Sequence, residues 1–150
     1  MKNFVLFFAL IMGGDLFTLQ AQDPVSWTFT SKKIDDKTYE IRLNAVLNGD
    51  WHIYSQSTPD GGPIPTTVSF AKNPILTLDG GVKEVGKVES HFEPLFGVDV
   101  KQFSGKVAFV QTVKLKVTVK TKISGSISYM VCNDQECMPP TKQSFSIALN

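Results

Sequence analysis

From residue 23 onward, hydrophobic and polar residues alternate in short runs that glycine, proline, asparagine and aspartate interrupt. Alternation with a period of two is typical of strands that bury one face, and no window shows a convincing helical period. Eight runs predict strands, over residues 25–31, 39–47, 52–56, 66–71, 82–88, 107–119, 126–131 and 143–149. Short strands in this number predict an all-β fold, an antiparallel β-sandwich.

The clearest alternation is KLKVTVKTK, residues 114–122. As a strand it places its lysines on one face and Leu115, Val117 and Val119 on the other. We expect the lysine row to be a solvated face, with a binding patch as the alternative.

The remaining connections follow from turn-forming residues. Residues 58–67, TPDGGPIPTT, predict a loop rich in proline and glycine, and Gly80-Gly81 predicts a tight turn. The sequence contains no internal repeat and no long linker, so we expect one domain.

Composition agrees with one globular domain: the chain has 150 residues, 42% of them hydrophobic and 19% charged. The formal net charge of +1 gives no overall field that would favour nucleic acid or an anionic membrane as partner.

Residues 1–21 have the features of a secretory signal peptide, with a lysine followed by the apolar run FVLFFALIM and then small and polar residues. The run is too short to span a membrane. We expect cleavage after Ala21, a domain over residues 22–150 in the periplasm, and no direct membrane insertion after cleavage. A buried N-terminal helix is the alternative. Export favours a disulfide over a zinc site.

Both cysteines lie in residues 130–140, MVCNDQECMPP, with four residues between them. Strand-like runs flank this stretch, and the intervening polar residues are typical of a turn. We therefore expect Cys132 and Cys137 to face each other across the mouth of a hairpin, within disulfide reach.

Such a bond would close a ring of about six residues, which stabilises a fold by only about 2 kcal/mol, against about 4.7 kcal/mol for a ring of a hundred. This favours a redox role over a structural one, because exposed or strained disulfides are the labile ones. Asp134 and Glu136 are acidic and Lys142 is the nearest cation, so little lowers a thiol pKa here. We expect the pair to be attacked more readily than it attacks. A structural clip and metal ligation remain alternatives.

Two further segments are unusual. In WHIY, alternation places His52 and Tyr54 on one face and Trp51 and Ile53 on the other. The alternative is that Trp51 and Ile53 pack in the core while His52 and Tyr54 lie on the surface.

The segment HFEPLFG, residues 91–97, is apolar but contains a proline and ends in glycine, so it predicts a loop. Its side chains Phe92, Leu95 and Phe96 must pack on something. We expect them to cover the sulfurs and the loop to be mobile, whereas the alternative is that they plug one end of the sandwich.

Together these segments resemble the N-terminal periplasmic domain of the thiol:disulfide interchange protein DsbD family, over nearly the whole exported chain. The match comprises Cys132, Cys137 and the double proline Pro139-Pro140. His52 and Tyr54 fall where the family has tyrosines beside the cysteines, so a histidine replaces one tyrosine. The family's cap loop corresponds to Phe92, Glu93, Leu95, Phe96 and Gly97.

The resemblance implies an immunoglobulin-like sandwich that relays reducing equivalents to oxidised envelope proteins. It implies thioredoxin-like proteins of the cell envelope as partners, and Cys137 as the attacking thiol. Because the sequence ends at Asn150 without a transmembrane part, we expect a separate membrane-embedded donor of reductant. No cofactor or nucleic acid is implied. In terms of enzyme class, the chain resembles a domain of a protein-disulfide reductase.

Departures from the family pattern are local. The best-known member has one more residue between its cysteines and an aromatic residue where Met138 stands. Pro94 replaces a second acidic cap residue, and Leu95 replaces an aromatic one.

Two alternative functions remain open. One is an immunoglobulin-like binding module with an inert disulfide. The other is a copper carrier, in which Met130, Met138, the two cysteines and two histidines would supply soft ligands.

Overall fold

The computed structural model describes residues 23–94 and 96–150, and the predicted signal peptide and Leu95 lie outside the described residues. No helix in the described part of the chain is long and apolar enough to cross a membrane. The described residues form nine strands: β1 Val25–Lys33, β2 Thr38–Leu47, β3 His52–Tyr54, β4 Thr67–Phe70, β5 Leu76–Glu93, β6 Val98–Leu115, β7 Thr121–Tyr129, β8 Val131–Cys132 and β9 Thr141–Leu149.

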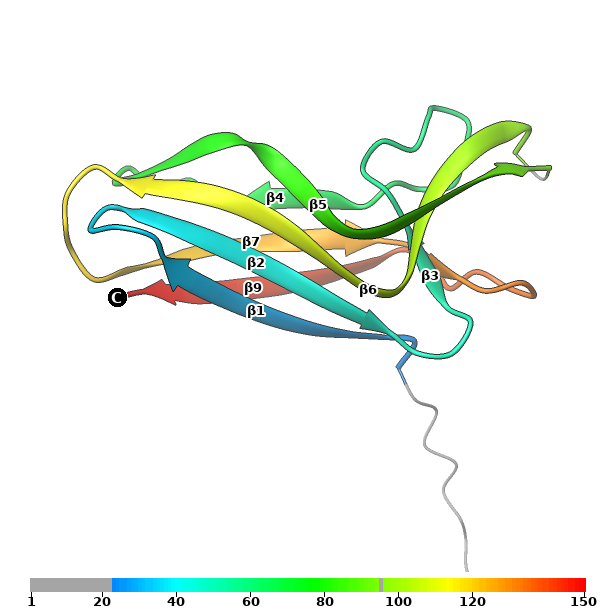
Figure 1. Ribbon diagram of the computed structural model, residues 1–150, viewed down its shortest axis with the longest axis horizontal. Coiled ribbons are helices and arrows are strands. Elements are labelled where there is room, and N and C mark those ends of the chain that lie inside the picture. The colour runs from blue at the N-terminus through cyan, green and yellow to red at the C-terminus, as the bar shows by residue number, and fades with distance from the viewer. Residues whose placement is uncertain (1–22, 95) are drawn as a thin grey trace, which may run out of the picture.

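The strands form two antiparallel sheets packed face to face (Figure 1), which confirms the predicted sandwich. The larger sheet has the order β1-β2-β6-β3-β8, and β5 also pairs with β6. Strand β6 is long enough to pair with β2 over one part of its length and with β3 over another. The smaller sheet has the order β4-β7-β9.

The core forms where the inner faces of the two sheets meet, as the alternation in the sequence requires. In β2, every second residue from Tyr39 to Leu47 is buried. The smaller sheet contributes Ile123 and Ile127 from β7 and Ile147 from β9.

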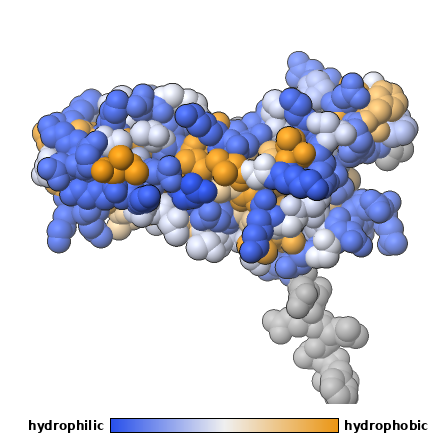
Figure 2. Space-filling view, viewed as in Figure 1, coloured by the Kyte–Doolittle hydropathy of each residue, from blue (hydrophilic) through white to orange (hydrophobic). Residues whose placement is uncertain are grey.

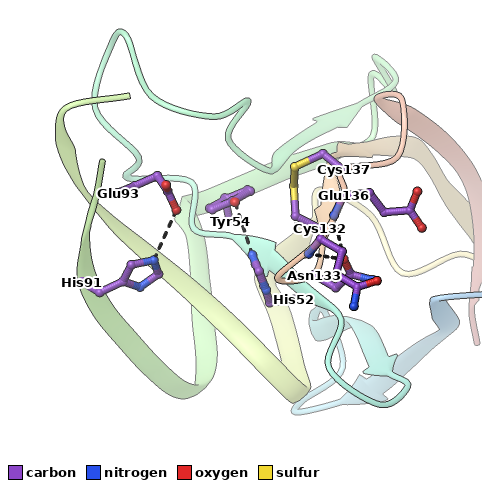
Figure 3. Close-up of a disulfide and its surroundings, with 9 residues drawn as sticks. His52, Tyr54, His91, Glu93, Cys132, Asn133, Glu136 and Cys137 are labelled. Atoms are coloured by element: carbon purple, nitrogen blue, oxygen red, sulfur yellow. Dashed lines mark hydrogen bonds and ion pairs between the residues drawn. A yellow bond between two sulfur atoms is a disulfide. The ribbon is translucent and has the colours of Figure 1, made fainter. Parts of the chain in front are cut away.

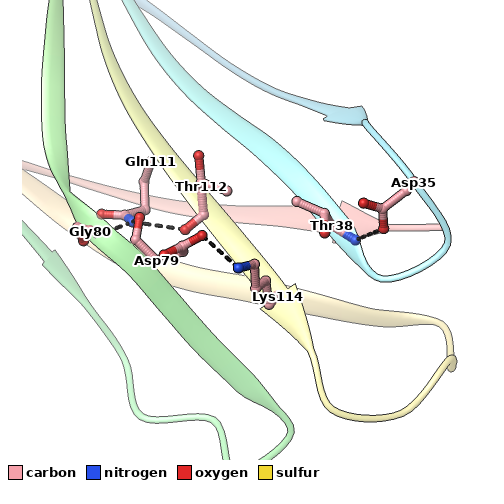
Figure 4. A network of polar contacts seen from close by, with 7 residues as sticks. All are labelled: Asp35, Thr38, Asp79, Gly80, Gln111, Thr112 and Lys114. Carbon is pink, nitrogen blue, oxygen red and sulfur yellow. Dashed lines mark hydrogen bonds and ion pairs between the residues drawn. The ribbon is translucent and has the colours of Figure 1, made fainter.

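One polar side chain, Gln111, is buried among these apolar residues. Its amide nitrogen donates to the backbone carbonyls of Asp79, Gly80 and Thr112 at 3.1, 3.2 and 2.8 Å (Figure 4). The pairing of β5 with β6 shifts register between Asp79 and Lys83. The predicted tight turn at Gly80-Gly81 is therefore wrong: these glycines form an irregularity within β5, and Gln111 satisfies carbonyls that the ladder leaves free.

The strand predicted over residues 107–119 is wrong at its end, because β6 stops at Leu115. Residues 116–120 connect the larger sheet to the smaller one, and Val117 and Val119 are exposed. The alternation of KLKVTVKTK thus continues past the point where the chain changes sheets.

At the other end, β5 and β6 extend beyond the sandwich as a long hairpin arm (Figure 1). Residues expected to form a loop, 91–93, belong to β5 instead. The turn is short: the amides of Phe96 and Gly97 both donate to the carbonyl of Glu93, at 3.1 and 2.8 Å. Gly97 has a φ of 68°, which glycine adopts without steric cost.

Candidate functional site

The cysteine hairpin leaves the smaller sheet and joins the larger one. After β7, strand β8 pairs with β3, and Cys132 also bridges to Cys137. The four-residue loop is closed by Asn133, whose side-chain oxygen accepts from the amides of Gln135 and Glu136 at 2.9 and 2.8 Å. The amide of Asn133 donates to the carbonyl of Glu136 at 2.9 Å. The predicted hairpin is confirmed (Figure 3).

Cys132 and Cys137 form a disulfide with an S–S distance of 2.01 Å and a Cα–Cα distance of 4.0 Å. The two residues differ in accessibility. Cys132 is 1% exposed because it is held in β8, whereas Cys137 lies in the exposed returning arm of the hairpin. An incoming thiol therefore meets Cys137 first.

His52 and Tyr54 lie beside the disulfide on β3 (Figure 3). His52 is directly opposite Cys132 in the antiparallel pairing, so their side chains share one face of the sheet. The Nε2 atom of His52 lies 3.2 Å from the Oη atom of Tyr54, and the rings meet edge to face. The predicted shared face is confirmed. The alternative is confirmed in one part, since Ile53 lies in the core and Trp51 packs against it. It is wrong in the other part, because His52 and Tyr54 are buried and do not lie on the surface.

Burial is the main electrostatic influence on this pair. It lowers the pKa of His52, and nearby His91 lowers it further, while Asp134 and Glu89 oppose the shift. Burial also raises the pKa of Tyr54, with a smaller contribution from Glu93. Both side chains are therefore neutral near neutral pH, and each is able to donate one hydrogen bond.

The described cap-loop residues, Phe92, Glu93, Phe96 and Gly97, lie at the tip of the β5–β6 arm. Nε2 of His91 lies 3.6 Å from Oε2 of Glu93, on the side of Tyr54 away from the sulfurs (Figure 3). Phe92 is 58% exposed and Phe96 is 40% exposed. Cys137 is exposed as well, and the expected cover over the sulfurs stays a prediction.

Sequence reasoning missed the residues that hold Tyr54 in place. Glu84 of β5 accepts hydrogen bonds from Oγ of Ser55 and from the amide of Gln56, both at 2.7 Å. The hydroxyl of Thr66 donates to the carbonyl of Tyr54 at 2.6 Å. These contacts connect β3 to the loop that contains Thr66, and the residues after β3 to the part of β5 that lies in the sandwich. A lone glutamate 29 residues from its serine gives no sequence signal.

Within the described residues, no three or more His, Cys, Asp or Glu side chains are grouped so that they could hold a metal ion. Met130 is half-buried and Met138 is exposed.

Fold and site together define an immunoglobulin-like sandwich domain with a hairpin disulfide at one end. The chain belongs to the family described as thiol:disulfide interchange protein DsbD, N-terminal, whose family model matches residues 18–149. Among curated proteins, no sequence matches the chain significantly.

Solved structures show the same fold. The N-terminal periplasmic domain of ScsB from Proteus mirabilis aligns with a TM-score of 0.59 and 16% identity, over 83% of this chain and 46% of that one. The reduced DsbD N-terminal domain of Neisseria meningitidis aligns with a TM-score of 0.52 and 15% identity, over 81% and 85%. A complex of the DsbD and PilB N-terminal domains from the same organism aligns with a TM-score of 0.52 and 13% identity, over 89% and 88%.

Proposed function

We propose that this chain is an exported thiol-disulfide exchange relay that works through Cys132 and Cys137. Reducing equivalents would come from a thioredoxin-like or membrane-embedded partner and pass to oxidised proteins of the envelope. The observation that carries the proposal is the asymmetry of the pair, with one exposed cysteine and one buried cysteine beside a neutral histidine and tyrosine.

In the first half of the cycle, a thiolate of the donor attacks Sγ of Cys137. The bond between Cys137 and Cys132 breaks, and its electron pair goes to Sγ of Cys132. The donor's second thiol then attacks the donor sulfur in the mixed disulfide. This step releases Cys137 as a thiolate, leaves the donor oxidised, and reduces the pair by two electrons.

In the second half, the exposed Cys137 thiolate attacks one sulfur of a client disulfide, which breaks that bond, forms a mixed disulfide and releases the client's first sulfur as a thiolate. Cys132 then attacks Sγ of Cys137, which re-forms the intramolecular bond and releases the client's second sulfur as a thiolate. The geometry favours this order, since Cys137 is accessible to a large partner while Cys132 is buried beneath it.

His52 and Tyr54 would assist both halves by stabilising the negative charge on Cys132. A buried thiolate is costly without a donor, and the register of β3 and β8 brings His52 to the same face. His52 and Tyr54 share one hydrogen bond, in which either can be the donor. The side chain that accepts this bond still carries a hydrogen of its own, which it can donate to sulfur.

The partner class is supported by the solved complex of a DsbD N-terminal domain with the PilB N-terminal domain. Cysteine trapping in the native envelope tests it. With Cys132→Ser, Cys137 should remain linked to a thioredoxin-like protein in a mixed disulfide that is resolved by reductant. The mirror variant, Cys137→Ser, should trap little, because the remaining Cys132 is buried.

The outcome separates the relay from its alternatives. No mixed disulfide with either variant, together with a reduction potential well below about −300 mV, would make the bond structural and the chain a binding module. Equal trapping by both variants would contradict the assigned roles of the two cysteines while leaving the exchange itself intact.

A further inference from the structure

Three connections gather at the end of the sandwich opposite the disulfide: residues 34–37, 71–75 and 116–120 (Figure 1). Backbone hydrogen bonds join them. The amide of Leu115 donates to the carbonyl of Lys37 at 2.7 Å, and the amide of Lys116 donates to the carbonyl of Ile75 at 2.9 Å. We call this surface the lysine end, and we include in it the strand residues that border the connections: Lys33, Asp79, Lys114 and Lys122.

Positive charge is concentrated here, although the chain as a whole is nearly neutral. Its aspartates are already engaged. Asp36 lies 3.3 Å from Lys33, Asp79 lies 2.8 Å from Lys114 (Figure 4), and Asp35 accepts two backbone amides. Among the described residues, five lysines of the lysine end have no ion pair: Lys37, Lys72, Lys116, Lys120 and Lys122. Of these, Lys116 donates to the carbonyl of Pro74 at 2.7 Å.

Aliphatic side chains stand among these lysines in solvent. Ile34 is 55% exposed, Val117 is 48% exposed and Val119 is 46% exposed. A single exposed aliphatic residue needs no explanation. Here three occur on two adjoining connections, and Lys116 and Lys120 flank the two valines directly.

Exposed aliphatic side chains beside lysines that have no ion pair match the chemistry of a lipid–water interface. The tips can enter the headgroup region, the lysine ammonium groups can meet phosphates, and the methylene stems of the lysines can lie along the boundary. A protein partner is the weaker match, because protein interfaces are depleted in lysine and centre on aromatic residues. The charge and apolar tips together favour a bilayer.

We propose that the lysine end binds the surface of bilayers that contain anionic phospholipids. The contact is peripheral, since only surface side chains of the lysine end reach the bilayer. A strand rises about 3.3 Å per residue, so the ten residues of β2 separate the lysine end from the disulfide end by about 30 Å. Bound in this way, the domain presents Cys137 away from the bilayer. The inference is independent of the exchange reaction.

The test uses protein purified in the form that accumulates in the envelope, with every variant compared in that same form. Wild-type protein should sediment with vesicles that contain phosphatidylglycerol and phosphatidylcholine, but not with phosphatidylcholine alone. Binding should weaken as salt is added. Changing Lys72, Lys120 and Lys122 to Gln should weaken it about 100-fold, at about fivefold for each lysine.

A matched control removes the same charge elsewhere: Lys83→Gln, Lys87→Gln and Lys106→Gln lie on β5 and β6, outside the lysine end. This variant should bind like the wild type. A tryptophan probe reports orientation independently. The emission of Val117→Trp should shift to the blue with anionic vesicles, while Val85→Trp, on the sandwich wall, should not shift.

Two results would overturn the proposal: equal loss of binding in the two lysine variants, or absence of binding to anionic vesicles by folded wild-type protein. The second result would also be expected if the lysine end serves an acidic protein. Unfolding midpoints of all variants, measured in parallel, exclude misfolding as the cause of any loss.

Discussion

The hydroxyl of Tyr54 offers the sharpest test of how the site handles charge. Changing Tyr54 to Phe removes one oxygen atom and keeps the ring that packs edge-on against His52. If this hydroxyl donates to the thiolate of Cys132, the variant should be reduced more slowly and should be harder to reduce at equilibrium.

The expected size follows from the environment. Hydrogen bonds to charged groups contribute about 1.5–3 kcal/mol, and Tyr54 and Cys132 are both buried, so water cannot readily replace the hydroxyl. If this hydrogen-bond energy is lost in full from the transition state, the disulfide should be reduced about 10 to 150 times more slowly. If the same energy is lost from the reduced state, the reduction potential should fall by about 30–65 mV, since 1.4 kcal/mol corresponds to about 30 mV for two electrons.

Rates would be measured by mixing the oxidised protein with a small thiol, and potentials by equilibration with glutathione. Tyr39→Phe is the control. It also removes a hydroxyl from a buried tyrosine, one that donates to the carbonyl of Asn150 at 3.0 Å on the far end of the sandwich. If Tyr54→Phe and Tyr39→Phe leave rate and potential equally unchanged, the thiolate is not stabilised by Tyr54.

Two other predictions concern stability. Gly125→Ala should lower the free energy of unfolding by about 3 kcal/mol or more, because a Cβ atom there would collide with the carbonyl of Ser69 and come within 2.6 Å of Cζ of Phe145. Gly81→Ala, where a Cβ meets nothing within 4 Å, should change the denaturant midpoint little; similar losses in the two variants would contradict this reasoning. The lowered pKa of His52 means that the unfolded chain binds the proton more readily. Stability should therefore be greatest above pH 6.5 and fall as the pH drops below it, and the fall should be smaller in His52→Phe. Identical pH profiles for the two proteins would refute the assignment.

The sequence was most informative where structure is local. The turn residues between Cys132 and Cys137 were enough to predict the hairpin, and the alternation in WHIY was enough to place His52 and Tyr54 on one face. Burial of that face was not visible, because it depends on β8 and the β5–β6 arm packing beside β3.

The errors arose where tertiary structure overrides pattern. Alternation through residues 114–122 predicted one strand, but the chain must leave one sheet for the other after Leu115. The pair Gly80-Gly81 was expected to reverse the chain, whereas Gln111 accommodates it inside a strand. The contact of Glu84 with Ser55 depends on two elements that are distant in sequence.

The short strand β8 fixes one cysteine to the sheet and leaves the other on a loop. The residues around the two cysteines are therefore under different constraints on substitution. Substitutions around Cys132 alter the framework of the larger sheet and are constrained by packing. Residues 134–136 and Met138 are exposed, so they can vary with the shape of a partner at little cost to the fold. In the proposed relay, one arm of the hairpin could therefore adapt to different clients while the other arm keeps the fold.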